Sequence, residues 1–365
     1  MHQNPEISFK EFHTSKAIEA FLDRTGIPYS RLSETGTIVH LGSNKHLKTL
    51  ALRGDIDALP IQEMVNTPFK SKEEGIMHAC GHDIHTTCLL GALSILKELN
   101  IRKIGNIKGI FQAGEEMLPG GASVLIEKGV LDGVDAIIGQ HVMPEMEVGS
   151  FGFRPGKYMA STDELHITIH GKGGHGAMPE KCIDPIEISA NIISGLRPMI
   201  KENTPSNVPS VITIGKITGN GATNVIPSHV NLEGTFRTMN EEWRAKAHLL
   251  IKNYIEKICK ENGATAEIDI RKGYPFLENN EELTFSATGW AKEINQSVRQ
   301  LDIRMTAEDF SFYSQEIPAC FYRLGVGVPN RENPGVHSPK FDPDEKSILH
   351  GSVMMAWLAY NYLTK

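Results

Sequence analysis

The sequence predicts an α/β protein: a mostly parallel sheet with helices on both faces, interrupted by an inserted ferredoxin-like α+β domain. Three observations lead to this prediction. A chain of 365 residues is long enough for two domains. Residues 36–141 repeat the order strand, polar tip, helix, which is typical of parallel sheets. Residues 160–271 instead follow the order β-α-β-β-α-β, the signature of a ferredoxin-like unit.

The first domain is expected to hold four apolar strands and two helices. In chain order these are a strand at 36–42, a strand at 49–53, a helix at 89–99, a strand at 108–112, a helix at 122–128 and a strand at 136–139. Polar side chains follow three of the strands: Asp55 and Asp57, Glu115 and Glu116, and His141. Ligands of open parallel sheets bind beyond the carboxyl ends of the strands, so we expect these side chains to meet at one edge.

The inserted domain is expected to contain four strands and two helices. They are a strand at 165–169, a helix at 185–200, strands at 211–217 and 230–237, a helix at 242–260 and a strand at 266–270. The chain then returns to the first domain and ends in a helix at 348–363. We therefore assign residues 1–158 and 272–365 to the first domain and residues 159–271 to the insert.

Charge and hydropathy restrict the partners of this chain. Its formal net charge of -7 arises from 44 acidic and 37 basic side chains, without a basic block, which argues against nucleic acid or an anionic membrane as a partner. A small-molecule substrate fits this charge balance better. No apolar stretch approaches the roughly 20 residues of a membrane span, and the N-terminus lacks the pattern of a secretion signal.

The five cysteines, at positions 80, 88, 182, 259 and 320, are odd in number and scattered along the chain. This usage argues against a disulfide framework and for a reducing compartment. We expect a cytoplasmic protein.

One candidate site is the segment His78-Ala79-Cys80-Gly81-His82-Asp83. Thiol, imidazole and carboxylate are the ligand types that a cation of zinc's softness prefers. Cys80 and His82 are two residues apart, so on a tight turn both side chains reach one small volume, and a thiolate can bridge two ions. Spacing alone leaves two other readings open: packed residues, or a nucleophilic cysteine activated by a histidine.

The adjacent carboxylates Glu115 and Glu116 strengthen the metal hypothesis. Neighbouring residues at a strand end point in different directions, so one carboxylate can bind a cation while the other stays free to deprotonate a water. The apolar run before the pair and the glycine turn after it argue against two solvated surface acids. His141 and His337 lie beside turn residues at the edges of apolar segments, although composition alone would not select them from 15 histidines.

Nine segments, in this order and spacing, match one family. They are His2-Gln3-Asn4-Pro5-Glu6, residues 52–60, 78–83, 112–116, 171–175 with Pro179, 224–227, 234–237, 308–310 and 337–339. The chain resembles the M20 metallopeptidases, and within them the amidohydrolase branch of hippurate hydrolases, N-acyl-amino-acid amidohydrolases (aminoacylases) and auxin-conjugate hydrolases. One departure is that family members carry a helix before the segment that here begins at His2.

The resemblance implies a binuclear site with two divalent metal ions per subunit. The implied ligands are Cys80, His82, Glu116, His141 and His337, with Cys80 between the two ions. Glu115 would be the general base, and Asp57 would fix the tautomer of a ligand histidine. Zinc or manganese is expected, and the mixed ligands also admit cobalt or nickel. His78, Asp83 and His85 are assigned to packing and supporting hydrogen bonds.

The resemblance also implies that the insert is a lid and dimerisation domain, giving a homodimer or a tetramer. His175 would reach the active site of a neighbouring subunit and stabilise the tetrahedral oxyanion. Asn224 and Arg237 would bind the substrate, since a guanidinium suits an α-carboxylate.

The implied reaction is metal-dependent hydrolysis of the amide bond of an N-acyl amino acid, releasing a carboxylic acid and a free amino acid. The nearest alternative is a dipeptidase or carboxypeptidase of the same clan, acting on a dipeptide substrate. A cysteine hydrolase that uses Cys80 and a binding protein without activity are the alternatives from other classes. The preferred acyl group and amino acid stay open.

Overall fold

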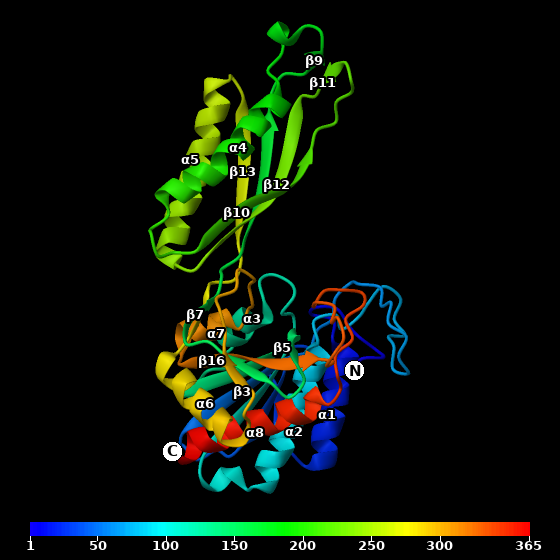
Figure 1. Ribbon diagram of the computed structural model, residues 1–365, viewed down its shortest axis with the longest axis vertical. Helices are drawn as coiled ribbons and strands as arrows, with labels where there is room; N and C mark the ends of the chain where they lie inside the picture. The colour runs from blue at the N-terminus through cyan, green and yellow to red at the C-terminus, as the bar shows by residue number, and fades with distance from the viewer. The chain divides into compact units, whose positions relative to one another are not determined.

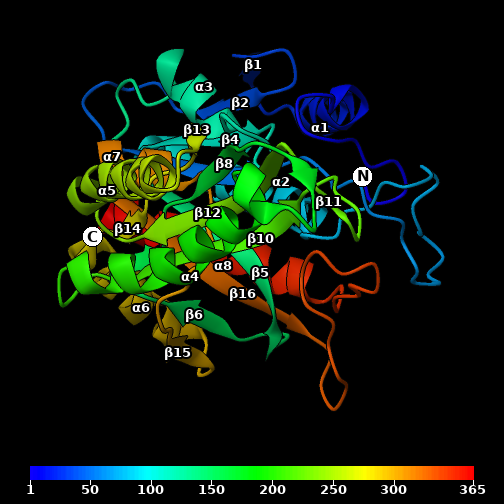
Figure 2. The same ribbon diagram turned by 90° about the horizontal axis from the view of Figure 1, so that it is seen from above.

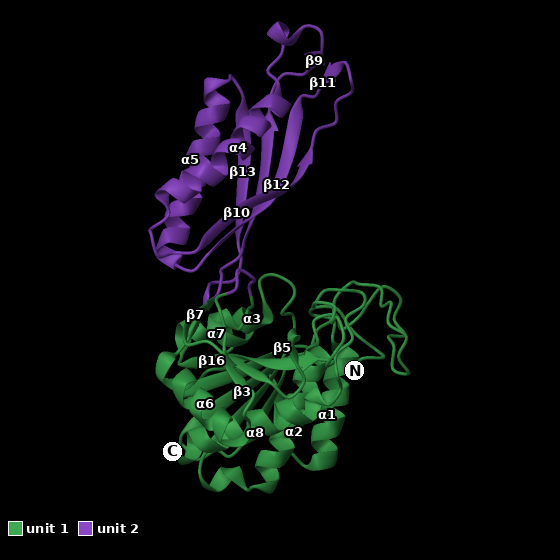
Figure 3. Cartoon of the chain, in the orientation of Figure 1, with its two compact units in different colours: residues 1–158, 278–303, 308–365 green, residues 159–277, 304–307 purple.

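The protein is described by a computed structural model of residues 1–365, in which the chain forms two compact units (Figure 3). Unit 1 comprises Met1–Tyr158, Glu278–Ile303 and Glu308–Lys365, and unit 2 comprises Met159–Leu277 and Arg304–Ala307.

The units differ from the expected boundaries at the return from the insert. We placed that boundary after residue 271, but unit 2 continues to Leu277 and also takes residues 304–307. These four residues belong to unit 2 because the backbone amide of Ala160 donates to the carbonyl of Arg304 at 3.1 Å. No sequence pattern predicts this local backbone pairing.

Unit 1 is built on an eight-stranded sheet with the strand order β1-β2-β4-β3-β5-β16-β6-β15 (Figure 1). The strands are β1 (Tyr29–Arg31), β2 (Thr37–Leu41), β3 (Thr49–Asp55), β4 (Asn106–Gln112), β5 (Ala136–Glu147), β6 (Phe151–Phe153), β15 (Val298–Gln300) and β16 (Ala319–Gly327). The four central strands β4, β3, β5 and β16 run parallel, whereas β1 and β2 pair antiparallel at one edge. Two short strands, β7 (Gly156–Met159) and β14 (Leu277–Asn279), pair separately.

Helices cover both faces of this sheet, which confirms the predicted fold class. They are α1 (Phe12–Thr25), α2 (His82–Glu98), the 3-10 helix η1 (Ile101–Lys103), α3 (Gly121–Glu127), α6 (Glu281–Ile294), α7 (Ser311–Glu316) and α8 (Ser347–Thr364). Helices α2, α6 and α8 pack on one face, and α3 and α7 lie on the other (Figure 1). All nine residues of β16 are buried, as expected for a strand covered on both sides. None of the helices is both long and apolar enough to cross a membrane.

Two elements of unit 1 are longer than the sequence predicts. Helix α2 begins at His82, seven residues before the predicted start at 89, because its first turns bury His82 and His85 instead of apolar side chains. Strand β5 continues to Glu147, so His141 lies within the strand and not beyond its end. It still lies level with the end of β3, because Arg53 pairs with Gly139 in the β3–β5 register.

Unit 2 has the predicted ferredoxin-like core. Its elements are β8 (Asp163–His170), α4 (Pro185–Asn203), β10 (Ser210–Thr218), β12 (His229–Thr238), α5 (Glu241–Glu261) and β13 (Thr265–Lys272). The sheet order is β10-β12-β8-β13 with every pairing antiparallel, and α4 and α5 pack side by side on it (Figures 1 and 2). A small ribbon of β9 (Gly174–His175) and β11 (Val225–Ile226), and the 3-10 helix η2 (Pro179–Lys181), were not predicted.

Local sequence explains where the two helices of unit 2 begin. The Asp184 carboxylate accepts a hydrogen bond from the amide of Ile186, and the Asn240 side chain accepts one from the amide of Trp243. Each side chain thus satisfies an amide that the helix leaves without a partner. Along β8, buried Leu165, Ile167 and Ile169 alternate with more exposed residues, so one face of the strand joins the core below the helices.

A buried ion pair lies at one end of this core. Asp163 is fully buried and accepts hydrogen bonds from Arg244 at 2.6 Å and from His248 at 2.7 Å. Burial opposes ionisation of the carboxyl, but the hydrogen bonds from His248 and Arg244 outweigh this effect and lower the pKa of Asp163. The pair therefore stabilises unit 2 while Asp163 is ionised.

We expect Asp163→Asn to destabilise unit 2 by about 1–3 kcal/mol at pH 7, because the buried Arg244 loses its charge-assisted hydrogen bonds to Asp163 and keeps only Glu241, at 3.0 Å, as counter-charge. Since the folded-state pKa is lowered, this stabilisation is present above about pH 4 and is lost as the pH falls through the lowered pKa. Hydrogen exchange of residues 163–170, measured from pH 7 to pH 3, should show the difference between parent and variant shrinking. The matched control is Asp269→Asn on β13, where both partners of the ion pair with Arg271 are exposed and the change should stay below about 1 kcal/mol. Equal losses in the two variants would contradict this account.

Candidate active site

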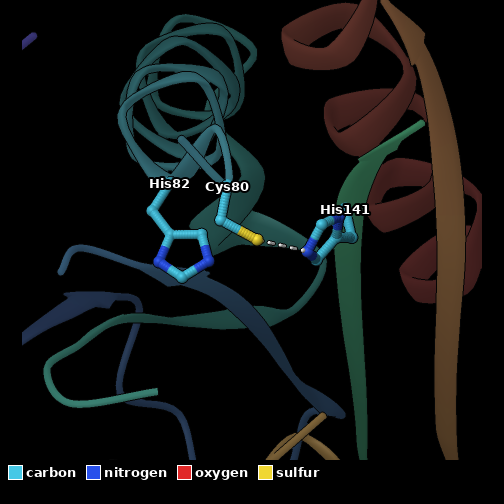
Figure 4. A group of neighbouring side chains, drawn as sticks. All are labelled: Cys80, His82 and His141. Carbon is cyan, nitrogen blue, oxygen red and sulfur yellow. Dashed lines mark hydrogen bonds between the residues drawn. The ribbon is translucent and has the colours of Figure 1, made fainter. Parts of the chain in front are cut away.

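The turn before α2 brings a thiol and an imidazole to the edge of the sheet. Gly81 joins Cys80 to His82 with a φ of 79°, and a Cβ at this position would lie 2.7 Å from a methyl group of Val142. Only glycine therefore lets the turn approach β5 so closely. As Figure 4 shows, the Cys80 Sγ lies 3.3 Å from the Nε2 of His141, with His82 beside it.

The orientation of His141 is fixed by its other ring nitrogen. The Nδ1 of His141 donates to the carbonyl of Val142 at 2.8 Å, which leaves Nε2 facing the thiol. Burial and the nearby Arg323 guanidinium hold the pKa of His141 well below its usual range. A neutral imidazole with one free nitrogen is the form that binds a metal ion.

Asp57 orients His82 in the same way. Its Oδ1 lies 3.1 Å from the Nδ1 of His82, while its Oδ2 accepts hydrogen bonds from the Ser8 hydroxyl at 2.7 Å and the Glu116 amide at 2.9 Å. The Nε2 of His82 is then buried without a hydrogen-bond partner. Buried polar atoms are rarely left in this state unless an ion or a water completes the site.

His337 approaches from the loop between β16 and α8. Its backbone has a φ of 62°, uncommon for a residue other than glycine, and its amide donates to the carbonyl of Ala79 at 2.8 Å. Its Nε2 lies 3.1 Å from the Oε1 of Glu116. Hydrogen bonding to Cys80 and Glu116 raises the pKa of His337 to about 10. Positive charge is thus strongly favoured at this point between a thiol and a carboxylate.

The five candidate ligands form two donor groups that share one thiol. In the group of Cys80, His82 and His141, and again in that of Cys80, Glu116 and His337, the donor atoms lie within 4.8 Å of one another. Thiol, imidazole and carboxylate donors suit divalent cations of zinc's softness. The donor set, with the unpartnered Nε2 of His82, fits a pair of cations.

Glu115 lies beside these groups in a cluster of acids. Its carboxylate is within 4.8 Å of the donor atoms of His82 and Glu116, and likewise of the carboxylates of Glu308 and Asp309. Burial and the charge of Glu308 raise the pKa of Glu115 well above its ordinary value. The amide of Asp309 donates to the Glu115 Oε1 at 3.4 Å.

Sequence reasoning gave no role to the cluster that surrounds Glu115. The fully buried Arg53 contacts Asp55 at 2.6 Å, Asp309 at 2.7 Å and Glu308 at 3.1 Å. Burial raises the pKa of Glu308 to about 7, in spite of Arg53. Arg53 and the pair Glu308 and Asp309 lie in two segments that match the family, 52–60 and 308–310. A short motif does not indicate, however, which residues its charged side chains contact.

The other residues of the histidine motif have supporting contacts. His85 uses both ring nitrogens, with Asp55 at 2.6 Å and the amide of Val142 at 2.8 Å. Asp83 contacts His2 at 2.7 Å. Burial lowers the pKa of His78 to about 4, and neither of its ring nitrogens has a hydrogen-bond partner. His85 and Asp83 thus make buried or partly buried hydrogen bonds, whereas His78 is buried without one, and the supporting roles of the three residues stay predictions.

The remaining predicted residues, His175, Asn224 and Arg237, lie in unit 2. His175 on β9 is exposed, and its Nδ1 accepts from the amide of Ala177 at 3.1 Å. The β9–β11 ribbon brings Asn224 next to it, because the amide of Gly176 donates to the Asn224 carbonyl at 2.8 Å. Arg237, on β12, donates to the Met305 carbonyl at 3.4 Å, and burial lowers its pKa.

The α/β fold of unit 1, with donor groups at the carboxyl edge of its central strands, defines the class as a metal-dependent hydrolase. The model of peptidase family M20/M25/M40 matches residues 51–361, so the chain belongs to this family, and the resemblance inferred from the sequence is confirmed. The protein is a metal-dependent amide hydrolase.

Several relatives cover the chain almost completely. It is 36% identical over 361 residues to N-acetylcysteine deacetylase of Bacillus subtilis, covering 98% of this chain and 94% of the relative. It is 37% identical to thermostable carboxypeptidase 2 of Saccharolobus solfataricus, covering 100% and 94%. It is also 37% identical to IAA-amino acid hydrolase ILR1-like 5 of Arabidopsis thaliana, covering 100% and 85%.

A solved structure agrees with these matches. The Bacillus subtilis YXEP protein, described as a dinuclear metal binding peptidase from the M20 family, superposes with a TM-score of 0.84 at 33% identity. The match covers 99% of this chain and 95% of that chain.

We expect Asp57→Asn to weaken divalent-cation binding about 10- to 100-fold, because the amide no longer fixes the ring of His82 as the carboxylate does. Competition with a chromophoric chelator measures this affinity. The control is Ser8→Ala, which removes one hydrogen bond to Asp57 but leaves its contact with His82, and should have a smaller effect. Unchanged affinity in Asp57→Asn would show that His82 does not depend on this carboxylate.

Proposed function

We propose that the protein hydrolyses the amide bond of N-acyl amino acids and releases a carboxylic acid and a free amino acid. The observation that carries this proposal is the pair of donor groups sharing Cys80, with Glu115 lying beside them. The names of two relatives support the substrate class: one describes deacetylation of N-acetylcysteine, the other hydrolysis of IAA-amino acids.

Cys80, His82 and His141 would hold one divalent cation, and Cys80, Glu116 and His337 would hold the other. Zinc or manganese suits this mixture of sulfur, nitrogen and oxygen donors, and cobalt or nickel is also compatible. A bound pair of such cations supplies Lewis acidity, which lowers the pKa of a water and polarises the amide carbonyl.

Glu115 is the general base in this proposal. Its carboxylate is buried, so it holds a proton readily once it has taken one from the attacking water. The same oxygen atoms then deliver that proton to the leaving nitrogen of the amide. Asp57 acts at a distance from this step by orienting His82.

Unit 2 supplies the proposed substrate contacts. Arg237 binds the α-carboxylate in this proposal. Its hydrogen bond to the Met305 carbonyl is long, 3.4 Å, and burial lowers its pKa, so an anionic partner would stabilise its charge. Asn224 assists it, and His175 stabilises the oxyanion in the active site of a neighbouring subunit. The corresponding assembly is a homodimer formed through unit 2, or a tetramer, in the cytoplasm.

A carboxypeptidase or dipeptidase activity is the second candidate. It is favoured by the 37% identity to thermostable carboxypeptidase 2 of Saccharolobus solfataricus. Both reactions cleave an amide bond next to a free α-carboxylate, so the two candidates differ in what precedes that bond: an acyl group, or an amino acid with a free amine.

We expect the metal-reconstituted protein to prefer N-acyl amino acids over dipeptides with the same C-terminal residue by ~10-fold or more in kcat/KM, the effect of about 1.4 kcal/mol. A panel of N-acetyl, N-benzoyl and indole-3-acetyl amino acids, assayed beside the matching dipeptides, measures this ratio. The methyl ester of each N-acyl amino acid is the control, because it lacks the carboxylate proposed to bind Arg237. Preference for the free-amine dipeptides would instead support the peptidase reading.

We expect Glu115→Gln to lower kcat by about 10²- to 10⁴-fold, since an amide cannot accept the proton, while the bound metal content stays that of the parent. Steady-state kinetics together with metal analysis measures both quantities. Glu127→Gln makes the same chemical change at an exposed position at the end of α3 and should leave kcat unchanged. Near-normal turnover in Glu115→Gln would assign the base to another residue.

A further inference from the structure

Three buried acidic side chains near Glu115 share one guanidinium. Arg53 on β3 is 0% exposed and contacts Asp55, Asp309 and Glu308 at distances between 2.6 and 3.1 Å. Glu115 has donor atoms within 4.8 Å of those of Glu308 and Asp309. Arg53 therefore ties the segment 308–310 to the strand that ends beside the candidate metal ligands.

Asp309 is fully occupied by structural contacts. Besides Arg53, it accepts hydrogen bonds from the Gln112 side chain at 2.7 and 2.9 Å and from the Ala122 amide at 3.0 Å. Its side chain thus holds the segment to β4 and α3, while its backbone amide points to Glu115.

Glu308 gives the segment its local shape. Its Oε1 accepts a hydrogen bond from the amide of Phe310 at 3.2 Å and is 3.1 Å from Arg53. One oxygen atom thus closes a tight turn around the Asp309 amide and anchors that turn to a buried cation. The direction of the Asp309 amide follows from this turn.

We propose that Glu308, anchored by Arg53, is a positioning residue for Glu115: it shapes the turn whose Asp309 amide holds the Glu115 carboxylate ready to act as base. This inference rests on the role proposed above for Glu115. The proposed turn also gives a reason why the adjacent carboxylates Glu115 and Glu116 take different roles. Glu115 lies within 4.8 Å of donor atoms of His82 and Glu116, so it is near enough to join the cation ligands unless another contact holds it.

The test compares Glu308→Ala with Glu308→Gln in the metal-loaded enzyme acting on an N-acetyl amino acid. Glutamine keeps the Oε1 acceptor for Arg53 and Phe310, whereas alanine removes it. We expect the alanine variant to lower kcat about 10- to 100-fold, the usual effect of losing a supporting contact, with KM and metal content close to those of the parent. The glutamine variant should stay within roughly threefold of the parent on the same scale.

A double-mutant comparison tests whether the effect of Glu308 on kcat is transmitted through Glu115. If Glu308 acts through Glu115, Glu308→Ala adds no further loss of kcat in a Glu115→Gln background. Arg53→Lys is the second variant, in case the alanine variant does not fold: it keeps the charge but loses the planar fork that contacts several carboxylates, and its effect should also vanish in that background. Glu316→Ala, an exposed change at the end of α7, is the matched control.

Any of three kinetic results would overturn the proposal: parent-like turnover in Glu308→Ala, an equal loss in Glu308→Gln, or the same fold-loss with and without Glu115. A fall in metal content would also overturn it, because Glu308 would then act on the ligands. If Glu115→Gln alone kept near-normal turnover, the proposed base would be wrong, which is a separate and distinguishable failure.

Discussion

The parallel register of β3 with β4 and β5 is the constraint on which the site depends. Asp55 pairs with Gln112, and Arg53 pairs with Gly139, so the ends of β3 and β4 and the middle of β5 lie at one level. Residues separated by dozens of positions in the sequence thereby reach one small volume. A slip of one residue in β5 would turn His141 to the opposite face of the sheet, because side chains alternate along a strand.

The carboxyl edge of the unit 1 sheet concentrates buried acidic side chains. Several carboxylates and one thiol are buried there, and the Arg53 guanidinium contacts three of the carboxylates directly. Removing such groups from water is costly unless opposite charge is supplied. Burial and neighbouring acids raise the pKa of Glu115, and hydrogen bonds to Cys80 and Glu116 raise that of His337, so added positive charge lowers the cost of ionising this edge. Cation binding and proton release are therefore coupled at this site.

Apolar periodicity predicted four of the eight strands of the unit 1 sheet, three of its helices (α2, α3 and α8) and the order of elements in unit 2, but it missed the central strand β16 and the helices α1, α6 and α7. The boundaries predicted from apolar periodicity were wrong where polar side chains occupy buried positions. Helix α2 starts seven residues early because His82 and His85 take core positions, and β5 outlasts its apolar run.

The candidate ligands also divide into residues that the sequence pattern identifies and residues that it does not. Cys80 and His82 were recognised from their spacing. His141 was placed at the sheet edge because it follows a predicted strand, but its role as a ligand, like that of His337, came from resemblance to the family. Both groups of donor atoms are together in the structure. The partnership of Arg53 with Glu308 joins strand β3 to a distant segment, and neither spacing nor composition indicates such a pairing. The roles of His175, Asn224 and Arg237 rest on the same resemblance.

Because both donor groups share Cys80, a change at one sulfur atom acts on the whole centre, whereas loss of any other donor affects one group. Oxidation to a sulfenic or sulfinic acid would be such a change. The fold guards against it: Cys80 is 6% exposed, and burial and the charge of Glu116 raise its pKa, so the free thiol resists forming the reactive anion. Bound cations would keep Cys80 as a thiolate, which is the form that an oxidant such as peroxide attacks, but they would also cover the sulfur atom. The empty and the metal-loaded protein should therefore differ in their sensitivity to peroxide.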